Sequence, residues 1–278
     1  MSKRYGFRRP WVVRNADLTL EAGALVRVVG LNGSGKSTLL RLIAGSSEPT
    51  RGSISGRPRT GFVPERFPPA LPLGAGPFLV HLGRIHGLPG AEARARAERW
   101  LERFGIGAYG GTPLRVLSKG TCQKVAIAGA LIAEPELLVL DEAWTGLDQA
   151  GRATLDDEIV NRVGNGATVV FVDHDPRRLY GRPDRHLGIS PGGQLTEESA
   201  PDPPPDLPAV GAIVIEVSGY RGTPAGLAGM VGVLSVEAGP AGLAVRVDPG
   251  CSDDVLRHLL AEPRVHVVAV RQLPGEGL

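Results

Sequence analysis

The chain has 278 residues, which is enough for one large domain and a second, smaller one. Its formal net charge is only +2, so charge balance gives no reason to expect a nucleic acid or an anionic membrane as partner. The two cysteines lack any pair spacing, which is typical of a reducing compartment, and no apolar run approaches the roughly 20 residues of a membrane-spanning helix.

The first two thirds of the chain alternate between strand and helix patterns. From Ala24 a short apolar strand leads through a glycine turn into a helix that starts near Lys36. Further apolar strands are predicted at 137–142 and 168–175, with a helical stretch between them. Such alternation favours a parallel sheet covered by helices, so we expect an α/β fold.

Two amphipathic helices are predicted within residues 74–104, before the second strand. We expect their apolar faces to pack into a core. These faces would be formed by Phe78, Leu79, Leu82 and Ile85 in the first helix and by Ala93, Ala97, Trp100, Leu101 and Phe104 in the second.

The last third of the chain is set apart by a proline-rich stretch, residues 199–208. Proline stiffens the chain and cannot donate to a sheet ladder, so this stretch is predicted to be a linker. Residues 209–278 then show the patterns of strand, helix, strand, strand, helix and strand in that order. This order is typical of a small ferredoxin-like α+β domain.

The strongest motif is GLNGSGKS, residues 30–37, which follows a predicted strand and opens a helix. Its glycines let backbone N–H groups converge on phosphate oxygens, and the helix N-terminus favours negative charge. Lys36 would neutralise β- and γ-phosphate charge, while the Ser37 hydroxyl would complete a Mg²⁺ shell. The residues predicted to bind nucleotide here are Gly30, Asn32, Gly33, Ser34, Gly35, Lys36, Ser37 and Thr38.

Two acidic residues end the predicted strand LLVLDE, residues 137–142. Asp141 would emerge at its C-terminal end and hold magnesium through water, and Glu142 would polarise a water that attacks the γ-phosphate. His174, at the end of the next strand, could hydrogen-bond the same phosphate and water. We therefore predict Glu142, His174 and Lys36 as catalytic residues; the alternatives are a solvated acidic pair and a merely structural histidine.

Together these motifs resemble the ATP-binding subunits of ABC transporters, and the resemblance covers about residues 3–198. It implies a P-loop NTPase domain at 1–198 that carries a helical subdomain at about 66–125. It further implies ATP and Mg²⁺ as cofactors, a homodimer or heterodimer that sandwiches two ATP molecules, and an integral-membrane permease as partner. The chain would then be cytoplasmic, peripheral on the inner face of the cell membrane, without a nucleic-acid partner.

The stretch LSKGTCQ, residues 117–123, stands where this family carries its LSGGQ signature. Ser118 and Gly120, which would face the γ-phosphate held by the partner chain, are kept. Lys119 and Thr121 replace a glycine and a glutamine, and the resulting LSKG is similar to the signature of exporter ATPases. The resemblance thus implies a working element whose added lysine charge lies near a polyphosphate.

The resemblance assigns several further positions. Tyr5 would stack on adenine, with Trp11 as second candidate, although the chain opens at MSKRYG where the family has a preceding strand. Asp148 would couple the two ATP sites. Glu65 stands where the family usually carries a glutamine that senses Mg²⁺ and the membrane subunit, and as an oxygen ligand it could serve the metal. Residues 65–90 are expected to include the permease contact.

The function expected from all this is ATP hydrolysis that powers export of a small molecule through a separate permease. The main alternative is an ABC-type ATPase that acts on ribosomes or DNA. Against it, the segment between Gly30 and Leu117 has no room for very long coiled coils, and the chain has one nucleotide domain. A guanine-nucleotide switch would need an N-K-x-D motif, which this sequence does not contain. A third alternative is the non-hydrolysing half of a heterodimer; the presence of Glu142 and His174 argues against it. The C-terminal domain is expected to serve dimer contact or regulation.

Overall fold

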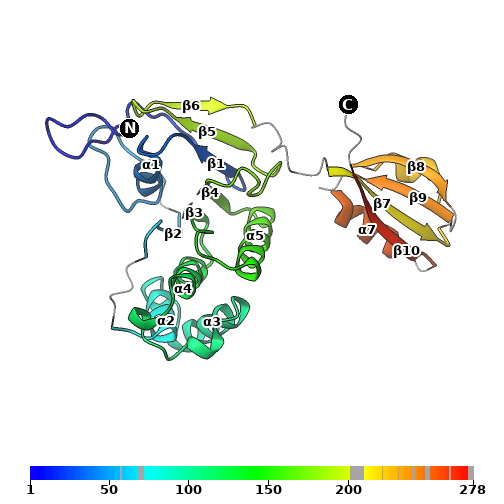
Figure 1. Cartoon of the computed structure of the whole chain (residues 1–278), viewed down its shortest axis with the longest axis horizontal. Helices are drawn as coiled ribbons and strands as arrows, with labels where there is room; N and C mark the ends of the chain where they lie inside the picture. Colours follow the sequence, from blue (N-terminus) through cyan, green and yellow to red (C-terminus); the bar gives the residue numbers. More distant parts are fainter. Residues whose placement is uncertain are drawn as a thin grey trace. The chain divides into compact units, whose positions relative to one another are not determined.

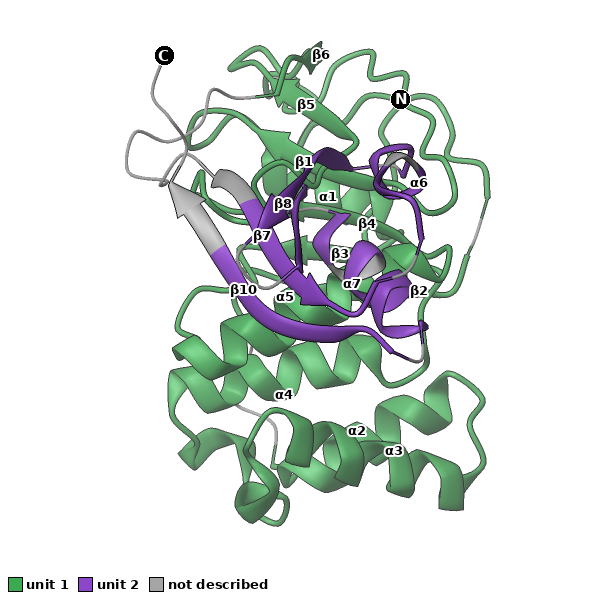
Figure 2. Cartoon of the chain, turned by 90° about the vertical axis from the view of Figure 1, so that its right-hand side faces the viewer, with its two compact units in different colours: residues 1–201 green, residues 202–278 purple. Residues whose placement is uncertain are grey.

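The structure is a computed structural model that describes residues 1–56, 58–67, 72–200, 210–220, 222–230, 232–239, 242–247, 251–262 and 264–274. It divides into two compact units, Met1–Pro201 and Asp202–Leu278, which Figure 2 shows in green and purple. Most of the proline-rich linker predicted at 199–208 lies outside the described residues.

A six-stranded sheet forms the centre of unit 1, in the order β2-β3-β4-β1-β5-β6. The first five strands in this order pair in parallel, and β6 runs antiparallel to β5. Both β3 and β4 are buried along their whole length, which is why they appear in the sequence as continuous apolar runs rather than alternating ones. The strands are β1 (Leu25–Val29), β2 (Thr60–Val63), β3 (Leu137–Asp141), β4 (Thr168–Val172), β5 (Arg185–Ile189) and β6 (Leu195–Glu198).

Helices cover both faces of this sheet, so the parallel α/β fold expected from the sequence is confirmed. One core joins α1 to side chains such as Val28 and Val139, and a second core joins α4 and α5 to Leu138 and Phe171. Figures 1 and 2 both show α2 and α3 beyond α4, away from the sheet. The helices are α1 (Lys36–Ile43), α2 (Ala75–Ile85), α3 (Gly90–Arg103), α4 (Lys119–Leu131) and α5 (Gln149–Gly164), with 3₁₀ turns at Gly107–Tyr109 and Leu114–Val116.

Three local expectations were wrong. Ile85 does not join the core face of α2: it is 64% exposed, because the helix ends there and the chain turns away at His86. The strand expected at 137–142 ends at Asp141, since Glu142 adopts a left-handed backbone conformation with φ 53°. The strand expected at 168–175 ends at Val172, where the Asp173 carboxylate accepts the backbone N–H of Asp175 and forms a turn.

Unit 2 has a four-stranded antiparallel sheet in the order β10-β7-β9-β8. Its own core includes Ile215, Val217, Leu227, Val245 and Val255. The description of this unit as ferredoxin-like stays a prediction. Across the described part of both units, none of the helices has the length and apolarity to cross a bilayer. The elements are β7 (Val210–Ser218), α6 (Pro224–Ala228), β8 (Val233–Gly239), β9 (Gly242–Val247), α7 (Ser252–Leu260) and β10 (His266–Pro274).

Candidate nucleotide site

The loop between β1 and α1 is held so tightly that only glycine fits at two of its positions. A Cβ on Gly30, at φ 149°, would lie 2.6 Å from the carbonyl oxygen of Ile189. A Cβ on Gly35, at φ 110°, would lie 2.5 Å from the carbonyl oxygen of Val12. The loop then runs directly into α1, whose first turn has backbone N–H groups available to an anion.

Lys36 folds back over this loop. Its ammonium group donates to the carbonyl oxygens of Gly30 and Leu31, at 2.8 and 3.1 Å, and the residue is only 8% exposed. Ser34 has a buried hydroxyl without a hydrogen-bond partner in the part of the chain that the structure describes. A positive charge and an unpaired hydroxyl in a glycine loop are the features that a phosphate group would satisfy.

Asp141 and Ser37 lie side by side at the C-terminal edge of the sheet. The Ser37 hydroxyl donates to Oδ1 of Asp141 at 3.2 Å, whereas Oδ2 is buried without a partner among the described residues. Burial raises the pKa of Asp141, the Ser37 hydrogen bond opposes that rise, and the negative charges of Glu65 and Glu142 add to it. A buried carboxylate with an unused oxygen, next to a hydroxyl, fits a hard divalent cation such as Mg²⁺.

Glu142 and His174 meet because they follow neighbouring strands. In the sheet, Asp141 pairs with Val172, so the residues just beyond β3 and β4 lie close together. Oε1 of Glu142 is 2.7 Å from Nε2 of His174. An acid and a histidine in hydrogen-bond contact at a strand edge are able to orient a water and accept its proton.

Nine of the predicted residues line one cavity of about 440 Å³. It is lined by Val12, Asn32, Gly33, Gly35, Lys36, Ser37, Thr38, Glu65, Glu142 and His174. Tyr5, the predicted adenine contact, is half-exposed beside this cavity, and its hydroxyl lies 3.3 Å from Oγ1 of Thr38. The ring of Trp11 instead lies under two guanidinium groups, those of Arg4 and Arg51, at 4.7 and 5.4 Å.

Ser118 and Gly120 are placed at the start of α4, outside the residues that line this cavity. Ser118 is the N-cap of α4, and its hydroxyl accepts the backbone N–H of Thr121 at 3.1 Å. Both Ser118 and Gly120 are accessible to solvent. The two predicted halves of the site thus lie in different places on the same chain.

Three contacts fix the start of α4 against the segment that follows Glu142. A Cβ on Gly120 would lie 2.5 Å from the carbonyl oxygen of Gly146, and the Gln123 side-chain amide donates to the carbonyl oxygen of Ala143 at 3.0 Å. Lys124 pairs with Asp148 at 2.8 Å. Sequence reasoning assigned no role to Gln123 or Lys124, although Lys124 is one of only four lysines in the chain.

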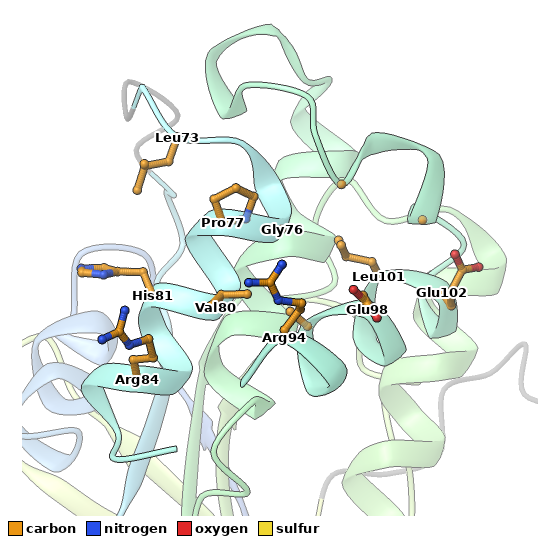
Figure 3. A pocket seen from close by; sticks show the side chains of 13 residues that line it. Leu73, Gly76, Pro77, Val80, His81, Arg84, Arg94, Glu98, Leu101 and Glu102 are labelled. Carbon is orange, nitrogen blue, oxygen red and sulfur yellow. The ribbon is translucent and has the colours of Figure 1, made fainter. Parts of the chain in front are cut away.

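A second cavity, of about 640 Å³, lies between α2 and α3 (Figure 3). The α2 side of its lining carries Pro77, Val80, His81 and Arg84, while α3 contributes Arg94, Glu98 and Leu101. Figure 3 shows the Arg94 and Glu98 side chains of α3 near one another over this hollow. It falls partly within 65–90, the segment expected to contact a permease; residues 68–71 of that segment lie outside the described residues.

Comparison with known proteins agrees with this geometry. The model of the ABC transporter family matches residues 13–145. Daunorubicin resistance ATP-binding protein DrrA3 of Streptomyces coeruleorubidus is 32% identical over 275 residues, which span 94% of this chain and 80% of DrrA3. The chain belongs to the ABC transporter ATP-binding family.

Other members of this ABC family match about 70% of the chain. Zinc import ATP-binding protein ZnuC of Roseobacter denitrificans is 35% identical over 206 residues, 72% of this chain and 76% of ZnuC. A solved ATP-binding subunit of an ABC transporter has a TM-score of 0.63 at 26% identity, covering 70% of this chain and 86% of its own. The dimeric ATP-binding cassette MJ0796, bound to ADP and Pi after hydrolysis, has a TM-score of 0.60 at 25% identity. The match covers 72% of this chain and 95% of the MJ0796 chain. This chain is accordingly an ATP-binding subunit of an ABC transporter and an ATPase.

Proposed function

We propose that this ABC ATPase powers export of a small molecule through a separate membrane permease. The observation that carries the direction is the match to DrrA3, a daunorubicin resistance protein, because it spans 94% of the chain. The match to the zinc importer ZnuC of Roseobacter denitrificans spans 72%. Import of a metal is the second candidate, favoured by the slightly higher identity of that shorter match.

The chain's own residues would bind ATP at the β1–α1 loop. Lys36 exchanges its two carbonyl partners for phosphate oxygens, and the α1 N-terminus adds backbone donors. Ser37 and Asp141 would hold Mg²⁺, with Glu65 at the same cavity; the ion when bound neutralises charge on the β- and γ-phosphates. Tyr5, beside Thr38, is proposed to stack on adenine.

Glu142 and His174 would act on the water and the γ-phosphate. Glu142 orients the water and takes its proton, while His174 fixes the Glu142 carboxylate and donates to a γ-phosphate oxygen. Their contact at 2.7 Å gives the pair one shared geometry before substrate arrives. A charge distribution prepared in advance is the main source of rate enhancement in such sites.

Ser118 and Gly120 would complete the ATP site of a second chain. At the N-terminus of α4, Ser118 is exposed and Gly120 partly exposed, apart from the cavity that holds their own chain's proposed catalytic pair. The solved cassette MJ0796 is dimeric, which supports a dimer here as well. We propose that ATP closes such a dimer, either of two copies of this chain or of this chain and a homologue.

A permease would dock over the hollow between α2 and α3, with the ATPase on the cytoplasmic face of the membrane. The hollow combines apolar residues, Val80 and Leu101, with charges of both signs, Arg84 and Glu98. Such a mixture suits a short amphipathic helix better than a nucleic acid, which would need a basic surface.

Glu142→Gln tests the proposed site. Loss of the proton acceptor should lower ATP turnover by about 10²–10³-fold and leave ATP bound, so the closed state accumulates. The solution mass of this variant with ATP and Mg²⁺ should be that of a dimer, and with ADP that of a monomer. Adding Ser118→Arg should abolish the dimer without changing ATP affinity. Turnover at the wild-type rate would contradict the role of Glu142, and a monomer with ATP would contradict the homodimer and point to a second chain.

The direction of transport needs a separate experiment in cells. Deletion of this chain should sensitise cells to toxic small molecules such as daunorubicin if it powers export, whereas it should lower cellular zinc if it powers import. The wild-type chain should restore the phenotype and Glu142→Gln should not. A zinc deficit without drug sensitivity would overturn the proposal of export.

A further inference from the structure

The turn that carries His174 is attached to the sheet by a buried arginine on β1. Arg27 is only 4% exposed, and burial lowers its guanidinium pKa. Its Nη2 donates to the carbonyl oxygens of Asp173 at 3.3 Å and Asp175 at 2.8 Å. Its Nη1 donates to those of Pro176 at 3.1 Å and Arg178 at 3.4 Å. One guanidinium therefore fixes four backbone carbonyls on both sides of His174.

A second arginine ties the same turn to the segment after Glu142. The Arg178 guanidinium donates to Oδ2 of Asp156 at 2.8 Å and lies 5.2 Å from the ring centroid of Trp144. Oδ1 of Asp156 accepts the indole N–H of Trp144 at 2.7 Å. Trp144 is 2% exposed and stands two residues beyond Glu142, so Asp156 joins the two catalytic segments.

The His174 side chain itself has little packing to hold it. It is 56% exposed, while its partner Glu142 is 23% exposed. An exposed imidazole keeps one position only if its backbone is fixed, because side-chain packing supplies no constraint. The four hydrogen bonds from Arg27 provide that constraint, and Arg27 lies on β1, the strand that leads into the phosphate loop.

We propose that Arg27 is a positioning residue for hydrolysis: with Arg178, it holds the 173–178 turn so that His174 meets Glu142 and the γ-phosphate. The inference rests on the proposed role of His174. Arg27 touches neither water nor nucleotide in this proposal. It acts on the rate of hydrolysis through His174 and leaves ATP binding to the phosphate loop.

A double-mutant cycle in the full-length chain tests this coupling. His174→Ala should lower kcat about 100-fold. Arg27→Gln should lower kcat about tenfold, with ATP affinity unchanged, because misplacement of a catalytic group costs rate. In the His174→Ala background the Arg27→Gln change should cost nothing further, since the group that Arg27 positions is already absent. Arg27→Lys should recover part of the rate, as it keeps a donor to the turn.

Arg162 provides the matched control. Its side chain is 13% exposed and pairs with Glu158 on α5 at 2.6 Å, outside the cavity. Any change in kcat caused by Arg162→Gln should be the same in the wild-type and His174→Ala backgrounds. An equal loss from Arg27→Gln in both backgrounds, or a loss of ATP affinity at constant kcat, would overturn the inference. If the Arg27→Gln variant does not fold, Arg178→Gln replaces it in the double-mutant cycle. The result expected and the results that would overturn the inference are then the same.

The cycle also separates failure of the inference from failure of the proposed function. Wild-type kcat in His174→Ala alone would contradict the catalytic role of His174. A tenfold loss that persists after His174 is removed would instead leave that role intact and contradict the positioning role of Arg27.

Discussion

Gly120 has no room for a side chain, because an added Cβ would lie 2.5 Å from the carbonyl oxygen of Gly146. Gly120→Ala should therefore push the start of α4 away from the segment after Glu142. We expect this variant to bind ATP normally but to lose ATP-dependent dimerisation and hydrolysis, because Ser118 would no longer be placed for the partner's phosphate. Equilibrium ATP binding and solution mass, measured on the same protein, check both parts.

Gly164 offers a control for that substitution. It ends α5, and a Cβ there would meet no described atom within 4 Å. Gly164→Ala should leave turnover unchanged and raise the free energy of unfolding by up to about 1 kcal/mol, since alanine is the better helix former. Equal loss of dimer in the two alanine variants would show that the close approach to Gly146 is not the cause.

His186 should make the stability of unit 1 depend on pH. Burial lowers its pKa, the Arg27 charge lowers it further, and Glu198 acts in the opposite direction. The unfolded chain takes up a proton at His186 below about pH 6.5, before the folded chain does. Stability should consequently fall as pH drops from 6.5 through the lowered folded-state pKa, and be fully regained above 6.5.

His186→Gln should flatten that dependence. The measurement is the free energy of unfolding by denaturant at pH 7.5 and pH 5.5 in wild type and variant. His86→Gln, at an exposed histidine after α2, provides the matched substitution. A pH slope in His186→Gln equal to that of wild type would contradict the assignment.

At the scale of whole elements, Asp148 connects α4 and α5. Its Oδ1 caps α5 by accepting the backbone N–H of Gly151 at 2.8 Å, and its Oδ2 pairs with Lys124 of α4. The Lys124 hydrogen bond is the largest cause of its lowered pKa. The role in coupling two ATP sites that family resemblance implies for Asp148 stays a prediction.

Substitutions of Asp148 should separate the cap from the ion pair. Asp148→Asn keeps a capping oxygen and loses the charge, whereas Asp148→Ala loses both, so alanine should be less stable by about 0.5–2 kcal/mol. If the ion pair also couples the sites, both variants should lower the cooperativity of ATP hydrolysis equally. Thermal unfolding and the Hill coefficient for ATP give the two readouts. Equal stability of the two variants would show that the cap contributes little.

The sequence predicted those parts of the site whose chemistry dictates residue type and spacing. Gly30, Lys36 and Asp141 were predicted because a bound phosphate needs glycine turns and a cation, and its Mg²⁺ needs a nearby carboxylate, in a fixed order along strand and helix. Arg27 was missed, since one arginine inside an apolar strand looks like a solvent-facing residue until its carbonyl partners, far along the chain, are known. The prediction that Ile85 packs into the core was wrong for a related reason, because periodicity gives the face of a helix but not where the helix ends.

At the scale of the whole molecule, Glu142 and His174, the proposed catalytic residues, and the second unit belong to separate compact bodies. The residues that line the nucleotide cavity all fall within Met1–Pro201, and unit 2 builds its own core around Val217, Val245 and Leu259. A body with its own core is able to fold without the other, so the nucleotide site should not need unit 2.

A chain that ends at Ala200 should therefore bind ATP with the affinity of the full-length protein. If unit 2 serves dimer contact, one of the two roles expected of it, the same chain carrying Glu142→Gln should dimerise more weakly with ATP than full-length Glu142→Gln does. Calorimetric ATP binding and solution mass over a range of concentrations measure the two effects, with Lys36→Ala as the variant that should fail to bind. Loss of ATP binding on truncation would mean that unit 2 supports the fold of unit 1. Unchanged dimerisation would instead remove unit 2 from the dimer contact and leave regulation as its role.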